Sequence, residues 1–168
     1  YRSLCILALN QARGRPGEDL PAGEMMTSPN EPIALEDLDE GMTASIEQTV
    51  STEDVAGFGK ATGDFNPLHF DAEFVSTTVF GTPIAHGILS AGFISAVIGT
   101  RLPGPGTIYL SQELRFRSPV RIGDTVTARV TVAAVDRDRR RVRLETACLV
   151  GDEVVLEGEA LVLVPQRA

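Results

Sequence analysis

The chain of 168 residues has no tryptophan and contains two tyrosines, two cysteines and two histidines. Cys5 and Cys148 lie near opposite ends of the sequence, so they form neither the closely spaced ligand pairs of a metal site nor a disulfide framework. Two cysteines are compatible with a reducing compartment. The scarcity of histidine is more informative, because any histidine chemistry must use His69 or His86.

Positive charge and long apolar runs are also scarce. The chain carries 15 Lys and Arg against 23 Asp and Glu, a net charge of -8, whereas general nucleic-acid binders are basic. The longest apolar run, residues 84–101, contains polar residues and glycines and is shorter than the roughly 20 apolar residues of a membrane-spanning helix. No cleavage site follows the short apolar stretch at residues 4–9. We therefore expect a cytoplasmic protein that binds neither nucleic acid nor a membrane.

The first 32 residues differ in composition from the rest. Seven glycines and prolines interrupt residues 10–32, and no apolar period survives there. We expect residues 1–32 to be an N-terminal extension that is either flexible or not native to the protein. A short docking helix at residues 3–12 is the alternative. The folded domain is expected to span residues 33–168.

Local signals predict short elements in the first half of this domain. A strand is expected at about residues 42–49. The run Ser51-Thr52-Glu53-Asp54 is a capping-box pattern and predicts a helix over about 52–61 that ends at Gly63. Asp71 is placed to cap a second short helix at about residues 72–78.

The apolar run at residues 84–101 predicts a helix. It is apolar almost all round, which is typical of a buried helix rather than an amphipathic surface helix. Gly87, Gly92 and Gly99 lower its helix propensity, and we expect them where another backbone packs closely.

After residue 106 apolar and polar residues alternate with the period of a half-buried strand. This pattern predicts four long antiparallel strands, and polar turns follow the second and the third of them. One buried helix beside an antiparallel sheet is an α+β fold. The strands are expected at about residues 107–117, 126–132, 142–148 and 156–164, and the turns at 136–139 and 151–152.

The segment from Gly63 to His69 is the strongest candidate for a reactive site. Asp64 and His69, a carboxylate and an imidazole, lie five positions apart on a turn. Asn66 between them can fix the turn by an Asx-type hydrogen bond, so that both groups face one point. Such a pair can orient and activate a water molecule. The alternative is that Gly-Asp-Phe-Asn-Pro is a favourable turn and nothing more.

A second candidate segment, residues 82–89, is the start of the long helix. Free N–H groups at a helix N-terminus can hold a developing oxyanion, and Gly87 would let a carbonyl approach closely. The alternative is that His86 is a capped, satisfied histidine and Gly87 a packing contact. A metal site formed by Asp64, His69, Asp71 and His86 is a further alternative, but it lacks a known ligand spacing. We expect no metal and no cofactor.

Gly63-Asp64-Phe65-Asn66-Pro67-Leu68-His69, followed by Ala85-His86-Gly87, resembles the hydratase-2 signature of the MaoC-like family. The resemblance covers about residues 35–165 and is closest to the single-domain (R)-specific enoyl-CoA hydratases that supply monomers for polyhydroxyalkanoate synthesis. It implies a hotdog fold, in which an antiparallel sheet wraps a long helix. It also implies a homodimer with the substrate at the dimer interface.

The resemblance further assigns roles to residues of this sequence. Asp64 and His69 would hold the water that adds to a trans-2-enoyl-CoA, and Asn66 would orient their loop. The Gly87 N–H would bind the thioester oxygen. Ser95 and Ile98 correspond to positions that line the acyl pocket, although Ile98 as plain core is an equal alternative.

Arginine is concentrated in one part of the chain: residues 115–143 hold nine Arg and three Asp. By the period of two, Arg115 and Arg117 are expected on one face of a strand, where they could meet the phosphates of CoA. A solvated, salt-bridged face is the alternative, and for residues 137–143 it is the favoured one.

Other functions of the same fold stay open at this point. A hotdog thioesterase also uses a carboxylate and a helix N-terminus. A 3-hydroxyacyl dehydratase would run the reverse reaction on acyl carrier protein or CoA. A module that binds acyl-CoA without catalysis is the third alternative.

Overall fold

A computed structural model of the protein describes residues 32–167. Apart from Pro32, the predicted extension at residues 1–32 and the alternative docking helix at 3–12 lie outside the described residues. A short 3-10 helix at Leu35–Asp37 precedes the main elements. These are β1 (Thr43–Thr49), α1 (Thr52–Thr62), α2 (Pro67–Phe70), α3 (Ala72–Ser76), α4 (Gly87–Thr100), β2 (Ile108–Phe116), β3 (Thr125–Asp136), β4 (Arg141–Val150) and β5 (Glu153–Leu163).

The strands form one antiparallel sheet in the order β1-β3-β4-β5-β2. The four strands expected after residue 106 are β2 to β5, and the strand expected at 42–49 is β1, at one edge. The alternation of apolar and polar residues determines which face of the sheet is buried. Strand β3 buries every second residue from Val126 to Val132, while the intervening residues stay more exposed. The predicted α+β class is confirmed.

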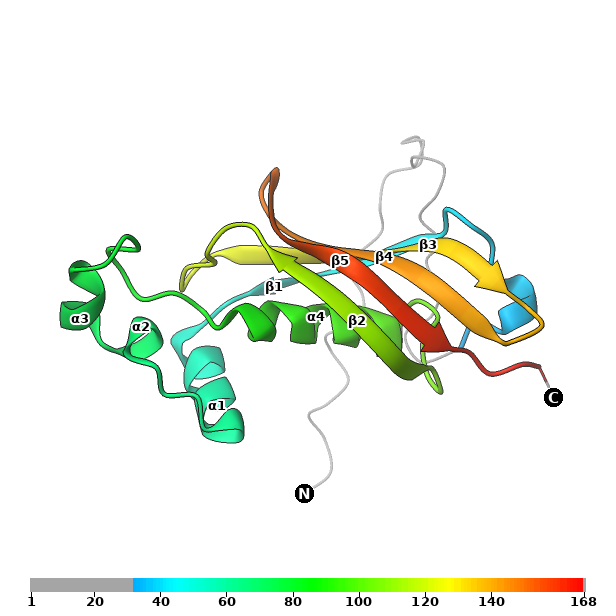
Figure 1. The fold of residues 1–168 in the computed structure, drawn as a ribbon, viewed down its shortest axis with the longest axis horizontal. Helices are drawn as coiled ribbons and strands as arrows, with labels where there is room; N and C mark the ends of the chain where they lie inside the picture. Colours follow the sequence, from blue (N-terminus) through cyan, green and yellow to red (C-terminus); the bar gives the residue numbers. More distant parts are fainter. Residues whose placement is uncertain (1–31, 168) are drawn as a thin grey trace, which may run out of the picture.

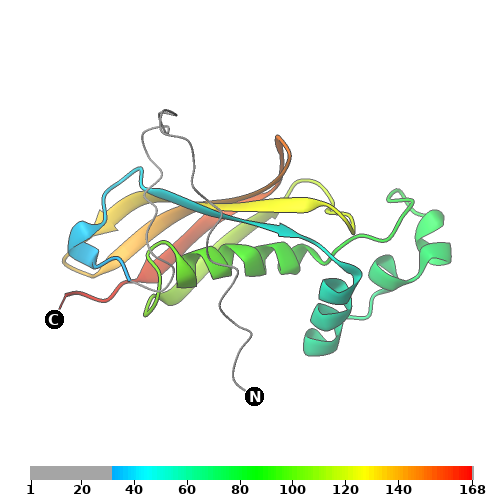
Figure 2. The ribbon, with the colours of Figure 1, turned by 180° about the vertical axis from the view of Figure 1, so that it is seen from behind.

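Helix α4 lies along one face of this sheet (Figures 1 and 2). Its side chains Ile94, Val97 and Ile98 are at most 1% exposed and join the core formed with the inner residues of the strands. This layer of one helix on one curved sheet is the arrangement expected of a hotdog fold. Among the described residues, no helix is both long enough and apolar enough to span a membrane.

The predicted helix at residues 84–101 is shorter in the structure. It begins at Gly87, because the backbone of Ile84 forms a bridge to Arg121 and the Ala85 N–H donates to the Val120 carbonyl. The preceding residues are therefore held by the segment around residue 120 instead of turning into the helix.

The expectation that this helix is buried all round is wrong for the described chain. The sheet covers only one side of α4, and Ile88, Gly92, Ser95 and Gly99 on other parts of its surface are exposed. A Cβ at Gly92 or Gly99 would meet nothing within 4 Å, so no described backbone packs closely against either glycine.

Helices α1 to α3 lie together beyond the N-terminal end of α4, at one end of the sheet (Figures 1 and 2). The predicted capping box starts α1: Ser51 Oγ accepts from the Asp54 N–H at 3.1 Å, and Asp54 Oδ2 accepts from the Ser51 N–H at 2.9 Å. The hydrogen bonds from the Ser51 backbone and hydroxyl lower the pKa of Asp54. Gly63 ends α1 with a φ of 81°, a left-handed conformation that favours glycine.

Candidate active site

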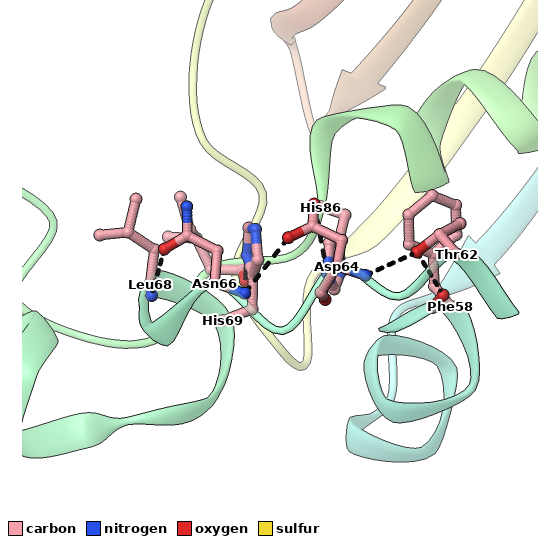
Figure 3. A network of polar contacts seen from close by, with 8 residues as sticks. Phe58, Thr62, Asp64, Asn66, Leu68, His69 and His86 are labelled. Atoms are coloured by element: carbon pink, nitrogen blue, oxygen red, sulfur yellow. Dashed lines mark hydrogen bonds and ion pairs between the residues drawn. The ribbon is translucent and has the colours of Figure 1, made fainter. Parts of the chain in front are cut away.

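The candidate site lies where the loop after α1 meets the chain just before α4 (Figure 3). Asp64, His69 and His86 come together there, with one carboxylate oxygen and one ring nitrogen from each histidine all within 4.8 Å of one another. The sequence-predicted pair is therefore adjacent in space, and the second histidine of the chain joins it.

Short-range hydrogen bonds shape the loop that carries Asp64. Thr62 Oγ1 donates to the Phe58 carbonyl at 2.8 Å and accepts from the Asp64 N–H at 3.2 Å. Asp64 Oδ1 accepts from the Asn66 N–H at 3.2 Å, and Asn66 Oδ1 accepts from the Leu68 N–H at 3.1 Å. The Asn66 side chain thus caps α2, which begins at the next residue and carries His69. The Asp64 side chain is half exposed.

His69 is held in one orientation by a backbone carbonyl. Its Nδ1 lies 2.8 Å from the Ile84 carbonyl oxygen, and its side chain is nearly buried, with 9% of the residue exposed. A carbonyl oxygen can only accept, so Nδ1 carries the proton of this hydrogen bond. In the neutral imidazole, Nε2 is then free to accept a proton or a hydrogen bond.

His86 is the most enclosed polar group of the site, with 2% of its surface exposed. Its ring faces the ring of His69 at a centroid separation of 3.7 Å and an interplanar angle of 30°. His86 Nε2 lies 3.0 Å from the Asp64 carbonyl oxygen and 3.9 Å from Asp64 Oδ2. Phe58 and Phe70 pack around it, with centroid separations of 4.8 Å and 5.8 Å.

The alternative of a fully satisfied His86 is wrong for one atom: within the described part of the chain, His86 Nδ1 is buried and has no hydrogen-bond partner. In the sequence, His86 falls within the predicted helix at 84–101 and joins Asp64 and His69 only in the metal alternative, so its place beside the acid–base pair was missed. The sequence contained one signal for this contact: the chain has two histidines, and each lies in one of the two candidate segments.

Gly87 lies beside an apolar pocket of about 460 Å³. A Cβ at Gly87 would approach Phe116 Cε1 to 2.6 Å, so the position accepts a side chain only if that ring moves. As the first residue of α4, Gly87 presents an N–H that has no partner within the helix. The residues that line the pocket include His69, Ile84, Gly87, Ile88, Phe116 and Leu156.

The other predicted site residues lie elsewhere. Ser95 is exposed on α4, and Ile98 is 1% exposed within the core, so neither lines this pocket. Asp71 lies outside the cluster formed by Asp64 and the two histidines, and its Oδ1 caps α3 by accepting from the Phe74 N–H at 2.9 Å. The four-ligand metal alternative therefore loses one of its ligands.

Arg115 and Arg117 both lie beside Glu157 of β5, as residues on one face should: Arg115 is its register partner, and Arg117 forms an ion pair with it. Strand β2 itself ends at Phe116, one residue before Arg117. Arg117 lines the apolar pocket and forms an ion pair with Glu157, whereas Arg115 lines a separate groove with charged residues of β3 to β5.

The later arginines follow the favoured alternative of a salt-bridged surface. Arg143 pairs with Glu159 and Arg139 with Asp136, each at 3.5 Å, and all four side chains are between 42% and 74% exposed.

Together, the fold and the site define a hotdog-type protein with a candidate acid–base pair and a helix N-terminus beside an apolar pocket. The chain belongs to the MaoC-like domain family, because the family model described as "MaoC like domain" matches residues 34–154. This confirms the family that the signature motifs predict.

Similar proteins are enzymes of acyl-CoA metabolism by name. The chain is 57% identical over 135 residues to the 3-hydroxybutyryl-CoA dehydratase of Methylorubrum extorquens, covering 80% of this chain and 86% of that protein. It is 54% identical over 133 residues to the (R)-specific enoyl-CoA hydratase of Rhodospirillum rubrum, covering 79% and 92%. The solved structure of the (R)-hydratase from A. caviae involved in PHA biosynthesis matches with a TM-score of 0.75 and 41% identity, covering 77% of this chain and 99% of that one.

Proposed function

We propose that the protein catalyses the reversible hydration of a trans-2-enoyl-CoA to an (R)-3-hydroxyacyl-CoA. The observation that carries the proposal is the meeting of Asp64 with His69 beside the N-terminus of α4, at the rim of an apolar pocket. The names and the extent of similarity of the relatives above support the substrate class.

In this mechanism Asp64 and His69 hold one water molecule between the carboxylate and Nε2. The water oxygen forms a bond to C3 of the enoyl group while the pair takes one proton from it. The electron pair of the C2–C3 double bond moves toward the thioester, and the pair returns a proton to C2. The sum is addition of H and OH from one water across the double bond, in which each acid–base group contributes about 10²–10⁴-fold.

The negative charge that develops on the thioester oxygen needs a donor. The Gly87 N–H points from the first turn of α4, where unpaired N–H groups and the helix dipole favour an anion. This interaction strengthens as the enolate forms and therefore accelerates the chemical step rather than binding alone. The acyl chain would lie in the pocket beside Gly87 and Phe116.

The functional unit we propose is a homodimer. Ile88 on α4 is 53% exposed, and β2 is an edge strand with Ile108, Leu110 and Phe116 between 45% and 55% exposed. An exposed apolar edge strand invites pairing with a second chain, so a copy of this chain is the proposed cover. In that arrangement Ser95 would contribute to acyl binding from the uncovered side of α4, with Ile98 behind it.

The finer expectations of a cytoplasmic protein and of a role in supplying polyhydroxyalkanoate monomers are part of the same proposal. They rest on the kinds of protein that the chain resembles.

An absorbance assay with crotonyl-CoA, combined with a thiol reagent, tests the reaction class. We expect loss of the conjugated thioester absorbance without release of free thiol. Release of thiol would instead indicate a thioesterase. No change with crotonyl-CoA would favour a carrier-protein substrate or a binding module, and would contradict the proposal.

A further inference from the structure

The proposed mechanism leaves one buried titratable group of the site unused. His86 contributes no atom to the reaction as described, yet its side chain is more deeply buried than the Asp64 carboxylate or the His69 imidazole. It is the residue directly before α4, and its side chain makes no capping hydrogen bond to the helix. A role in starting the helix therefore does not account for it.

The hydrogen bond of His86 determines which ring nitrogen carries a proton. Its Nε2 lies 3.0 Å from the Asp64 carbonyl oxygen, which can only accept, so Nε2 is the donor. Nδ1 is buried without a partner among the described residues. A buried polar atom left unpaired is costly, and a purely structural core residue would avoid it. Departures of this kind are expected at functional sites.

The two contacts of His86 each fix one member of the reacting pair. The Nε2–H bond holds the backbone of Asp64, whose carboxylate accepts from only the Asn66 N–H among hydrogen bonds of the described residues. The ring face of His86 packs against the ring of His69, which among residues 32–167 has one hydrogen bond, to the Ile84 carbonyl. Figure 3 shows Asp64, His69 and His86 gathered where the loop after α1 meets the chain before α4.

We propose that His86 is a positioning residue, which holds the Asp64 loop against His69 through its Nε2–H so that the carboxylate and the imidazole face one water. This inference rests on the proposed hydratase function. It predicts that the donor at the Nε2 position, rather than a polar residue in general, sustains the rate. A displacement of about 1 Å in such a pair can cost about 100-fold in rate.

Two amide variants test whether the rate depends on how far the donor at position 86 extends or only on the polarity of that side chain. In His86→Gln the amide nitrogen lies at the distance of Nε2 and can still donate to the Asp64 carbonyl. In His86→Asn the amide ends at the distance of Nδ1 and falls short. Asparagine is the better N-cap residue, so this variant should start α4 at least as well. We expect about a 100-fold lower kcat with little change in KM for His86→Asn, and a kcat within about tenfold of the parent for His86→Gln.

Equal rates for the two variants, whether both high or both low, would overturn the proposal when both melt near the parent temperature. His86→Phe, which keeps the ring packing without a donor, should match His86→Asn. If it instead keeps the parent kcat, the donor role is wrong.

A second measurement does not depend on activity. The chain has two histidines, so long-range ¹H–¹⁵N spectra of the unmodified protein resolve both rings directly. We expect a proton on Nε2 of His86 and on Nδ1 of His69. An unprotonated His86 Nε2 would overturn the proposal even in a folded protein that hydrates crotonyl-CoA. If the spectra are as expected but no hydration occurs, the proposed hydratase function is wrong, and the proposal that His86 sustains its rate is wrong as well.

Discussion

The two ends of α4 belong to regions that are held together in different ways. From Ile94 onward the helix packs on the sheet, and the strands beneath it bury every second side chain. At its N-terminus the chain is stabilised by side-chain hydrogen bonds of short range, and Asp64 and Phe65 are exposed. Burial therefore supplies stability in one region, whereas a few directed contacts supply geometry in the other. Substitutions at the N-terminus of α4 should lower activity and leave stability nearly unchanged. Substitutions in the core should lower stability and leave the activity of the folded protein nearly unchanged.

The largest expected effect is on activity at the N-terminal end of α4. Asp64→Asn or His69→Gln should lower kcat by about 10²–10⁴-fold, because each removes an acid–base group that touches the water. The melting temperature should change little, since neither residue belongs to the core. Steady-state hydration of crotonyl-CoA together with thermal melting measures both quantities.

Asp71→Asn is the matched control, because Asp71 lies two residues after His69 and caps α3 outside the cluster. It should keep near-parental activity. Near-normal turnover in the Asp64 or His69 variant would contradict the assignment of the pair.

The reverse pattern is expected in the sheet. Leu144→Ala removes a fully buried side chain and should lower the free energy of unfolding by about 2–5 kcal/mol. The kcat per folded molecule should stay close to that of the parent at a temperature where the variant is folded. Denaturant unfolding and active-site turnover test the two parts, and a large fall in kcat without loss of stability would break the separation.

Ile98 lies at the boundary of this comparison. Ile98→Ala should lower the free energy of unfolding by about 2–5 kcal/mol, because the side chain is 1% exposed in the core. If Ile98 also stands behind the acyl pocket, as proposed, the relative rates with longer enoyl-CoA substrates should rise. An unchanged chain-length profile would leave Ile98 as plain core and remove it from the proposed acyl site.

The smallest effect is expected at the capping box of α1. Asp54→Asn should lower the free energy of unfolding by about 1 kcal/mol at neutral pH. Hydrogen bonds in the folded state lower the pKa of Asp54, so its stabilisation is complete above the unfolded pKa of about 4 and is lost as the pH falls through the folded value.

Denaturant midpoints measured from neutral to acidic pH should therefore converge for the parent and Asp54→Asn. Glu53→Gln removes the same charge from the same helical turn without touching Ser51, and it should cost less. Equal losses for both variants would assign the effect to charge rather than to the capping box.

Patterns of short range made most of the fold predictable. The alternation in β3 and β4, the capping box and Gly63 each act over a few residues, so the sequence contains the whole signal. The start of α4 was not predictable, because a bridge between Ile84 and Arg121 decides it over 37 positions of sequence. The exposed side of α4 was misjudged because an apolar residue in a sequence does not reveal whether its cover comes from the same chain.

The part of the candidate site that lies on one turn was predictable in the same way. Asp64, Asn66 and His69 lie on one turn, and their contacts with backbone groups close by follow from it. The stacking of His86 on His69 and its bond to the Asp64 carbonyl join segments more than 15 residues apart, and no local period encodes them. The family resemblance placed Gly87 in the site, but only the structure reveals Phe116 against it.

Chiral analysis of the product formed from crotonyl-CoA tests the proposed reaction and its stereochemistry together. The proposed hydratase mechanism predicts (R)-3-hydroxybutyryl-CoA as the single product, with the thioester intact, and product formation reduced to at most a few per cent in the Asp64→Asn variant. Formation of the (S) product, of a racemic mixture, or of free CoA in place of a hydroxyacyl-CoA would contradict it.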